Sequence, residues 1–292
     1  MLPMNEWLKY VDITELNDKI CSFRELDFKK LTYRDIQKEI SNVISFNTPR
    51  GNYTLLAPTN SSYPVNTRFY RVRNIKEGDT TLPLNSMSTV ADCWEPPKKV
   101  VKPGRLNRQH EPLLYTSPIF PDNAVEELKI VDDKLFSLIV YEAVKPIKVT
   151  CIAFPPLIEG LTKDDALKLE MIQDFLKHEF IRDVDNGDEY LYRISESITK
   201  DYFDLRHISQ DAWCYPSIAK QGGYNVSFRP NKKQKLKLVG VQIASIKRDD
   251  NGHRFEVKAI AKDSGDGLNL SYHEMGSPEQ EDLFPEISPT KI

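Results

Sequence analysis

The stretch KLFSLIVYEAVKPIKVTCIAF, residues 134–154, decides the class of fold that the sequence predicts. It consists of two apolar segments rich in β-branched residues, and Lys145 and Pro146 separate them. This composition is typical of two inner β-strands, because branched side chains pack well on a pleated sheet. Helical patterns follow at 163–181 and 189–203. Strands and helices without strict βαβ alternation indicate a mixed α+β fold rather than a doubly wound sheet.

Other segments extend this prediction along the chain in both directions. Short strands are expected at 67–73 and 112–117, and an acidic N-cap predicts a short helix at 122–131. Near the C-terminus, the segments 235–248 and 253–262 are expected to pair as a hairpin across the turn DDNG.

The chain has 292 residues, enough to bury a large core, and we expect three regions. Residues 1–60 contain two helical patterns and are expected to form an N-terminal helical extension. Residues 61–262 are expected to form the main domain. Residues 263–292 contain seven acidic residues and one lysine, a net charge of −6. Few of their side chains can offset the entropy of ordering, so we expect a flexible acidic tail.

The amino-acid composition limits the classes of protein to which the chain could belong. The chain is 40% hydrophobic and 28% charged, and it has no apolar run of the roughly 18 residues needed to span a membrane. The N-terminus shows no secretion signal, and four scattered cysteines lie outside any CxxC spacing. We therefore expect a cytoplasmic protein with reduced thiols and no membrane partner. The five histidines lack metal-binding spacing, so we expect no metal.

Four segments resemble, in the same order, the motifs of RES domains, a family named after an arginine, a glutamate and a serine. They are FYRVR (69–73), KPGRLNRQHEPLLYTS (102–117), NAVEEL (123–128) and DAWCYPSIAKQGGYNVSF (211–228). The resemblance implies that 61–262 is a catalytic domain with an ADP-ribosyltransferase-like fold, a split mixed or antiparallel sheet with flanking helices. It also implies a toxin that consumes NAD and that a partner antitoxin holds in check.

The resemblance assigns nucleotide-binding roles to three arginines, a tyrosine and a serine. Arg71 matches the first family arginine, and Arg73 is the alternative on the same face of the strand. Arg105 matches the arginine of the Gly-Arg step, where a planar guanidinium can grip a diphosphate. Tyr115 matches a tyrosine that lies along the nicotinamide ribose or ring. Ser217 matches the family serine at the rim of the NAD site.

The family glutamate corresponds to Glu127, with Glu126 as the alternative. Departure of nicotinamide leaves an oxocarbenium-like ribose, and a carboxylate in a water-poor pocket stabilises its positive charge. Glu127 therefore forms the predicted catalytic set together with Arg71, Tyr115 and Ser217. NAD is the expected substrate, and its nicotinamide–ribose bond is the bond expected to break.

Two departures from the family pattern and several alternatives stand beside this prediction. Leu106 replaces an aromatic residue, and the spacing from Arg71 to Arg105 is longer than usual. Taken alone, each motif residue is more typical of a charged surface or a core position.

The acceptor of ADP-ribose is open between water, phosphate and a macromolecule, as in an ADP-ribosyltransferase. The basic run 229–237 could bind nucleic acid or an acidic partner, but alternating lysines are also typical of an exposed strand, so nucleic acid is not the expected ligand.

Overall fold

The computed structural model describes residues 4–56, 58–156, 158–206, 208–220, 222–249 and 252–288. His207, the centre of the expected turn at 250–251 and the last four residues of the expected tail lie outside the described residues.

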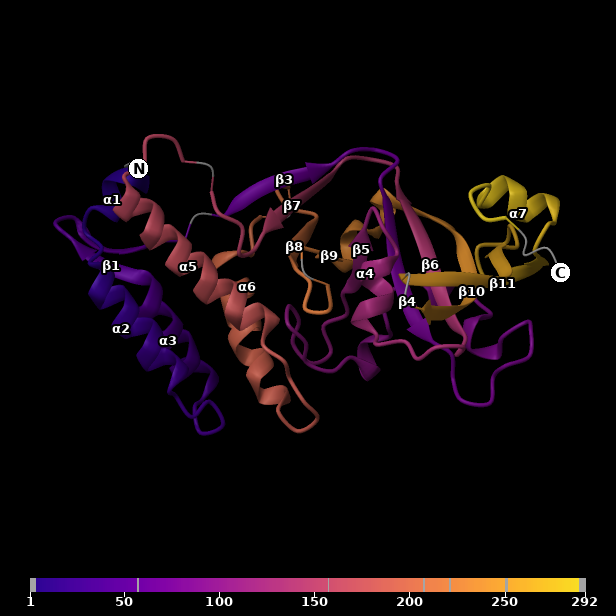
Figure 1. Cartoon of the computed structure of the whole chain (residues 1–292), viewed down its shortest axis with the longest axis horizontal. Coiled ribbons are helices and arrows are strands. Elements are labelled where there is room, and N and C mark those ends of the chain that lie inside the picture. The colour runs from indigo at the N-terminus through magenta and orange to yellow at the C-terminus, as the bar shows by residue number, and fades with distance from the viewer. Residues whose placement is uncertain are drawn as a thin grey trace. The chain divides into compact units, whose positions relative to one another are not determined.

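Two units make up the chain, and each contains three separate stretches of sequence (Figure 1). Unit 1 comprises 1–61, 99–111 and 148–218, and unit 2 comprises 62–98, 112–147 and 219–292. This division differs from the linear order of extension, main domain and tail that the sequence predicts. Both units contain strands and helices, so the predicted α+β class is confirmed.

Helices dominate unit 1. They are α1 (Met4–Leu8), α2 (Ile13–Arg24), α3 (Tyr33–Ile44), α5 (Lys163–Ile181) and α6 (Tyr192–Tyr202), with the 3-10 helix η4 (Glu189–Leu191) before α6. The side chain of Thr32 caps α3 by accepting from the amide of Asp35, and Thr162 caps α5 in the same way. Helix α2 packs against α3 and α5, where the rings of Phe23 and Phe175 meet edge to face with centroids 5.1 Å apart.

The strands of unit 1 form two groups. Strands β1 (Ser45–Thr48) and β2 (Gly51–Thr54) are an antiparallel pair. Strand β7 (Ile147–Cys151) runs parallel to β8 (Ala212–Pro216), and β3 (Thr59–Tyr63) follows β7 in the strand order. Strand β7 lies within the second apolar segment that decided the fold class. Strand β8 occupies the segment that the sequence presents as part of a motif, and its fully buried residue Trp213 donates to the carbonyl of Phe203 over 3.1 Å.

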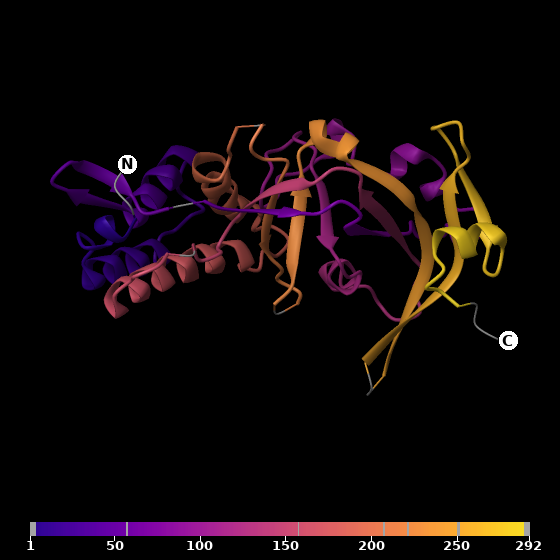
Figure 2. The ribbon, with the colours of Figure 1, turned by 90° about the horizontal axis from the view of Figure 1, so that it is seen from above.

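Antiparallel strands dominate unit 2. They are β4 (Arg68–Asn74), β5 (Leu114–Pro118), β6 (Phe136–Ala143), β9 (Tyr224–Phe228), β10 (Leu236–Asp249), β11 (Gly252–Asp263) and β12 (Leu270–Glu274). Their spatial order is β12-β11-β10-β6-β4-β5-β9. Figure 2 shows the long hairpin of β10 and β11, which confirms the pairing that the sequence predicts. Short helices accompany these strands: α4 (Asp122–Glu127), α7 (Pro278–Leu283), and the 3-10 helices η1 (Asn85–Met87), η2 (Val90–Cys93) and η5 (Pro230–Lys235). A further 3-10 helix, η3 (Lys98–Val100), lies at the sequence boundary between the units.

The two faces of β4 contact different parts of unit 2. Val72 packs in an apolar cluster with Ala124 and Val125 of α4. Phe69, on the other face, meets the ring of Phe228 in β9 with centroids 5.1 Å apart. Because side chains alternate along a strand, Arg71 and Arg73 lie on the same face of β4 as Phe69.

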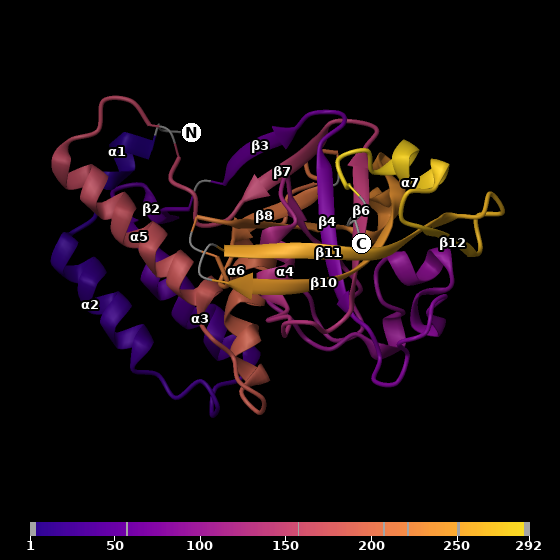
Figure 3. The same ribbon diagram turned by 45° about the vertical axis from the view of Figure 1, so that its right-hand side comes forward.

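Residues 264–288, expected to lie in a flexible tail, instead form β12 and α7 (Figure 3). Phe284 is fully buried and packs with Val140 and Ile260. The glycine at 240 makes room for it, since an added Cβ there would lie 3.2 Å from the Phe284 ring. Although the segment is mostly polar and acidic, a few of its residues are apolar, and their burial stabilises the folded segment.

Candidate functional site

A chain of hydrogen bonds in unit 2 connects three of the four sequence motifs. Ser117 of β5 donates through Oγ to Oδ1 of Asn225 over 3.0 Å. Asn225 of β9 in turn donates through Nδ2 to Oε1 of Glu127, at the end of α4, over 2.7 Å. Ser117 and Asn225 are buried, and Glu127 is half-buried. We call Ser117, Asn225 and Glu127 the Glu127 cluster.

Glu127, rather than Glu126, points into this cluster. The carboxylate of Glu126 lies 3.5 Å from Nη2 of Arg248, a partly exposed side chain that also pairs with Asp132. Consecutive residues at the end of a short helix point in different directions, so the two carboxylates have different partners. The two glutamates that the sequence leaves as alternatives therefore lie in different surroundings.

The loop before β9 fits closely against α4. Asn123 donates through Nδ2 to the carbonyl of Tyr224 over 2.8 Å, which ties the two segments together. A Cβ added at Gly223 would lie 2.1 Å from Oδ1 of Asn123, so only glycine allows this approach. Its neighbour Gly222 has a φ of +77°, in the left-handed region. The paired glycines thus allow the backbone to reach the position in which Asn225 contacts Glu127.

Tyr115 lies on the same strand as Ser117 and two residues before it, so both side chains point to one face of β5. It is paired in the strand register with Ser227 of β9, and it is half-buried. Ser227 is completely buried, and its hydroxyl has no hydrogen-bond partner among the described residues. The sequence-predicted tyrosine and glutamate therefore both belong to the region where β5, β9 and α4 meet.

Arg71 and Arg73 point to the other face of β4. Val72, between them, packs against α4, so alternation places both arginines on the face opposite that helix. Arg71 donates to the carbonyls of Cys93 and Trp94, and Arg73 donates to the carbonyl of Asp92. The structure thus does not bring these arginines together with Glu127. Here they anchor the backbone of η2, part of the long insertion that the sequence shows between the first two motifs.

Buried polar side chains surround the same backbone segment. The hydroxyl of Tyr141 donates to the carbonyl of Cys93, and the rings of Tyr141 and Trp94 have centroids 5.1 Å apart. Burial raises the pKa of Tyr141, and it raises the pKa of Cys93 to about 12. Both groups therefore keep their protons at neutral pH, as expected for a structural core.

Arg105 and Ser217 lie in unit 1. Arg105 donates through Nη2 to the carbonyl of Arg182 over 2.9 Å, and its guanidinium lies 5.5 Å from the ring centroid of Tyr192. Ser217 follows the last residue of β8 and is only 8% exposed. The predicted site residues are thus distributed over both units, with Arg105 and Ser217 in one and Glu127 and Tyr115 in the other.

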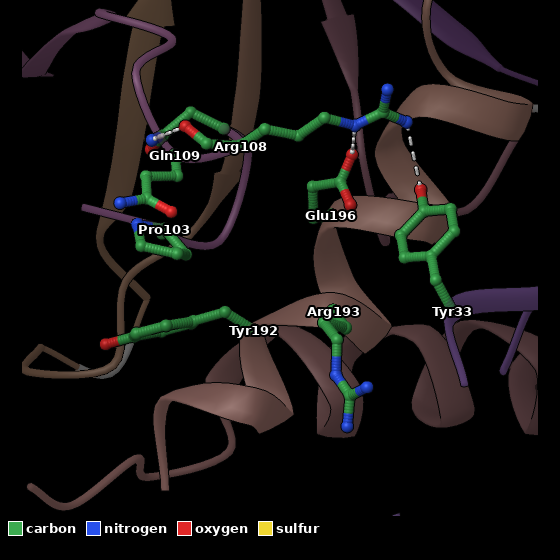
Figure 4. Close-up of a pocket in the computed structure, with 9 residues that line it drawn as sticks. Tyr33, Pro103, Arg108, Gln109, Tyr192, Arg193 and Glu196 are labelled. Atoms are coloured by element: carbon green, nitrogen blue, oxygen red, sulfur yellow. Dashed lines mark hydrogen bonds and ion pairs between the residues drawn. The ribbon is translucent and has the colours of Figure 1, made fainter. Parts of the chain in front are cut away.

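A cavity of about 370 Å³ lies in unit 1 beside the GRLN segment (Figure 4). Its wall consists of residues from α3, the loop before β5 and α6: Tyr33, Pro103, Gly104, Asn107, Arg108, Gln109, Tyr192, Arg193 and Glu196. Arg108 donates through Nε to the buried carboxylate of Glu196 over 2.9 Å and through Nη2 to the Tyr33 hydroxyl over 3.2 Å. These two hydrogen bonds raise the pKa of Arg108. Arg193 donates to the carbonyls of Tyr190, Leu31 and Phe28, so it mainly supports the wall.

The basic run at 229–237 is largely paired within unit 2. Lys233 lies 3.1 Å from Glu95, and Lys237 lies 2.7 Å from Glu142. Lys235 donates to the carbonyl of Pro146, and Arg229 is buried. Lys233, Lys235 and Lys237 thus each have a polar partner within unit 2.

Sequence reasoning did not assign Asn225, Ser117 or the pair of Arg108 and Glu196. Asn225 and Ser117 do lie within the quoted motifs, GGYNVSF and LLYTS. Their proximity depends on the pairing of β5 with β9, which are more than 100 residues apart in sequence. Among the described residues, no three or more His, Cys, Asp or Glu side chains form a group that could hold a metal ion, and no helix is long and apolar enough to cross a membrane.

Comparison of the sequence with models of known protein families gives no match, and comparison with curated proteins gives none either.

Proposed function

We propose that the chain is a RES-type enzyme with an ADP-ribosyltransferase-like fold, which breaks the bond between nicotinamide and ribose in NAD. The observation that carries the proposal is the hydrogen-bond chain from Ser117 through Asn225 to Glu127. It joins residues of three motifs around one carboxylate, and Asn225 lies about 100 residues from the other two in sequence. That carboxylate is the one that the family resemblance marks as catalytic.

The chemistry that we propose needs a fixed negative charge beside the ribose. As nicotinamide leaves, positive charge develops on the ribose, and a carboxylate that is already oriented stabilises it without reorganisation. The amide of Asn225 holds the carboxylate of Glu127 in place, and its own orientation is fixed by Ser117. Tyr115, on the same strand face as Ser117, offers an aromatic surface for the nicotinamide or its ribose.

Arg105 is the arginine that we propose for the diphosphate, ahead of Arg71 and Arg73. Arg71 and Arg73 hold the backbone around η2 on the face of β4 opposite α4, whereas Arg105 lies in the Gly-Arg step that the family resemblance marks for the diphosphate and donates to the carbonyl of Arg182 through Nη2. A guanidinium can bind phosphate oxygens in a bidentate way. Ser217, like Arg105, is proposed for nucleotide binding on the family resemblance alone. In a cell, NAD depletion would make the protein a toxin, held in check by an antitoxin.

The test of this function is direct product analysis. Purified protein is incubated with NAD, with and without phosphate, and the products are identified by mass spectrometry. Free ADP-ribose indicates water as the acceptor, ADP-ribose 1-phosphate indicates phosphate, and a mass increase on a protein indicates transfer to a macromolecule. Intact NAD under all conditions would contradict the proposal.

The matched pair Glu127→Gln and Glu126→Gln tests the role of the carboxylate. Both substitutions remove one charge from α4, but only Glu127 contacts Asn225. We expect Glu127→Gln to slow NAD cleavage by at least a hundredfold, about 2.7 kcal/mol of transition-state stabilisation, and Glu126→Gln to leave it nearly unchanged. Equal activity of the two variants would refute the assigned role of Glu127.

A further inference from the structure

The thiols of Cys151 and Cys214 lie side by side in unit 1. Strands β7 and β8 are parallel, and Cys151 is the register partner of Cys214. The amide of Ile152 donates to the carbonyl of Cys214 over 2.8 Å, which fixes this register. Register partners on neighbouring strands point to the same face of a sheet. The two sulfur atoms are therefore neighbours although 62 residues separate the cysteines in sequence.

The backbone spacing suits a covalent link. Neighbouring strands lie about 4.7–4.9 Å apart, and disulfides join Cα atoms that are about 4.4–6.8 Å apart. A bond between Cys151 and Cys214 would therefore leave the strand pairing in place. Thiol–disulfide exchange with a small dithiol can reduce such a bond again.

The environment also activates one thiol. A hydrogen bond from the Cys214 side chain lowers the pKa of Cys151, against the opposing effect of burial. Cys93 lies in unit 2 without such a partner thiol, and burial raises its pKa to about 12. The thiolate is the form of cysteine that reacts with oxidants. Cys151 is thus better suited to initial attack, and Cys214 is placed to resolve the product.

We propose that Cys151 and Cys214 form a dithiol site at which a hydroperoxide reversibly installs an intramolecular disulfide. The Cys151 thiolate attacks the peroxide oxygen, which gives a sulfenic acid and releases hydroxide. The Cys214 sulfur then attacks the sulfur of that sulfenic acid, forms the S–S bond and displaces water. In total, two thiols and one hydrogen peroxide give one disulfide and two waters. Both cysteines are at most 5% exposed, which favours a small oxidant over a bulky disulfide.

The location of the link gives it a consequence for unit 1. The segment between the two cysteines contains α5 and α6, and Ser217 follows Cys214 by three residues. The disulfide would close this segment into a loop and fix the backbone that leads to Ser217. Any resulting change in NAD cleavage rests on the proposed function, whereas formation of the disulfide does not.

The experiment uses the full chain and hydrogen peroxide as the oxidant. After treatment, the protein is denatured, its remaining thiols are alkylated, and its peptides are mapped by mass spectrometry. We expect the number of alkylated cysteines to fall from four to two, with a linked peptide containing Cys151 and Cys214. Treatment with dithiothreitol should restore all four. Cys151→Ala and Cys214→Ala should each abolish the linked peptide, whereas the control Cys93→Ala should retain it.

Four alkylated cysteines after oxidation, or overoxidation of single cysteines without a linked peptide, would overturn the proposal. The map of the unsubstituted chain decides the question even if an alanine variant fails to fold. A linked peptide in a protein that leaves NAD intact supports the dithiol and contradicts the proposed function. NAD cleavage without a linked peptide gives the opposite result, so the two failures are distinguishable.

Discussion

At the scale of single residues, Asn225 determines the orientation of the Glu127 carboxylate. Its amide spans β5 and α4, accepting from Ser117 and donating to Glu127. Replacement by alanine removes both hydrogen bonds and leaves a buried hydroxyl unsatisfied, a loss of about 1–3 kcal/mol. We expect Asn225→Ala to lower kcat/KM for NAD cleavage by about tenfold to a hundredfold.

Ser117→Ala serves as the control for Asn225→Ala, because it removes only the outer hydrogen bond of the chain. Its effect on NAD cleavage should be smaller than that of Asn225→Ala. Both rates are measured by NAD consumption, with the melting temperature of each variant recorded beside them. Parent-like turnover in a correctly folded Asn225→Ala protein would show that Glu127 needs no such partner.

Thiol reactivity at the residue scale follows from burial. Burial raises the pKa of Cys93 from its ordinary value of 9.0 to about 12, so at pH 8 only about one thiol in ten thousand is ionised. The folded state favours the protonated thiol, and this contribution to stability is present below pH 9 and is lost as the pH rises from 9 towards 12. We expect iodoacetamide at pH 8 to alkylate the exposed Cys21 well before Cys93.

The measurement is a time course of alkylation of the native chain, followed by peptide mass spectrometry. Denatured protein, in which all cysteines are accessible, provides the reference rate. Equally fast modification of Cys21 and Cys93 in the folded chain would contradict the predicted protection of Cys93.

At the scale of elements, α7 stabilises unit 2 through Phe284. The ring is fully buried among Val140 and Ile260, directly over the glycine at 240. Removing a buried phenylalanine side chain costs about 3–5 kcal/mol, from lost burial and from the cavity that remains. We therefore expect Phe284→Ala to lower the free energy of unfolding in urea by this amount.

Leu268→Ala is the matched control, since Leu268 lies in the same C-terminal region but is 68% exposed. It should change the free energy of unfolding by less than about 0.5 kcal/mol. If Phe284→Ala were no less stable than Leu268→Ala, the C-terminal region would behave as the flexible tail that its composition suggests.

At the scale of the whole molecule, the N-terminal region is part of a folded unit rather than an appendage. Unit 1 combines 1–61 with 99–111 and 148–218, and α3 packs against α6. Removing residues 1–58 would expose Phe175 of α5 and deprive Arg193 of two of its carbonyl partners. We expect the shortened chain to aggregate or to lose the cooperative unfolding of unit 1.

Size-exclusion chromatography and thermal unfolding of the shortened and full-length chains test this prediction. Hydrogen exchange provides the control within the same experiment, because protection of α5 and α6 should fall while that of β6 and β10 in unit 2 changes less. A monomeric shortened chain with full protection of α5 would contradict the prediction.

The local structure was predictable where a local signal was strong. Thr162 lies directly before the apolar pattern of α5, and its side chain caps that helix. The branched residues at 134–144 form β6, whose interior is buried as expected. The sequence did not predict the ordered C-terminal segment, in which a few apolar residues lie among many charged ones. Phe284 is buried by strands outside its own segment, and a local pattern cannot show such a contact.

The sequence by itself determined the α+β class, the helical segments 163–181 and 189–203, the terminal hairpin and the set of candidate residues that includes Glu127, because these depend on short-range periodicity, turn chemistry and motif order. The acidic N-cap expected at Asp122 was wrong, since Pro121 precedes α4 and no side chain caps it. Only the tertiary structure decided that Glu127 rather than Glu126 contacts Asn225, that Arg71 points away from α4, and that each of the two units combines three separate stretches of sequence. These outcomes depend on strand register and on long-range pairing such as that of β5 with β9. A shift of one residue in either strand would turn every side chain to the opposite face, and that register is set by the packed core rather than by any single segment.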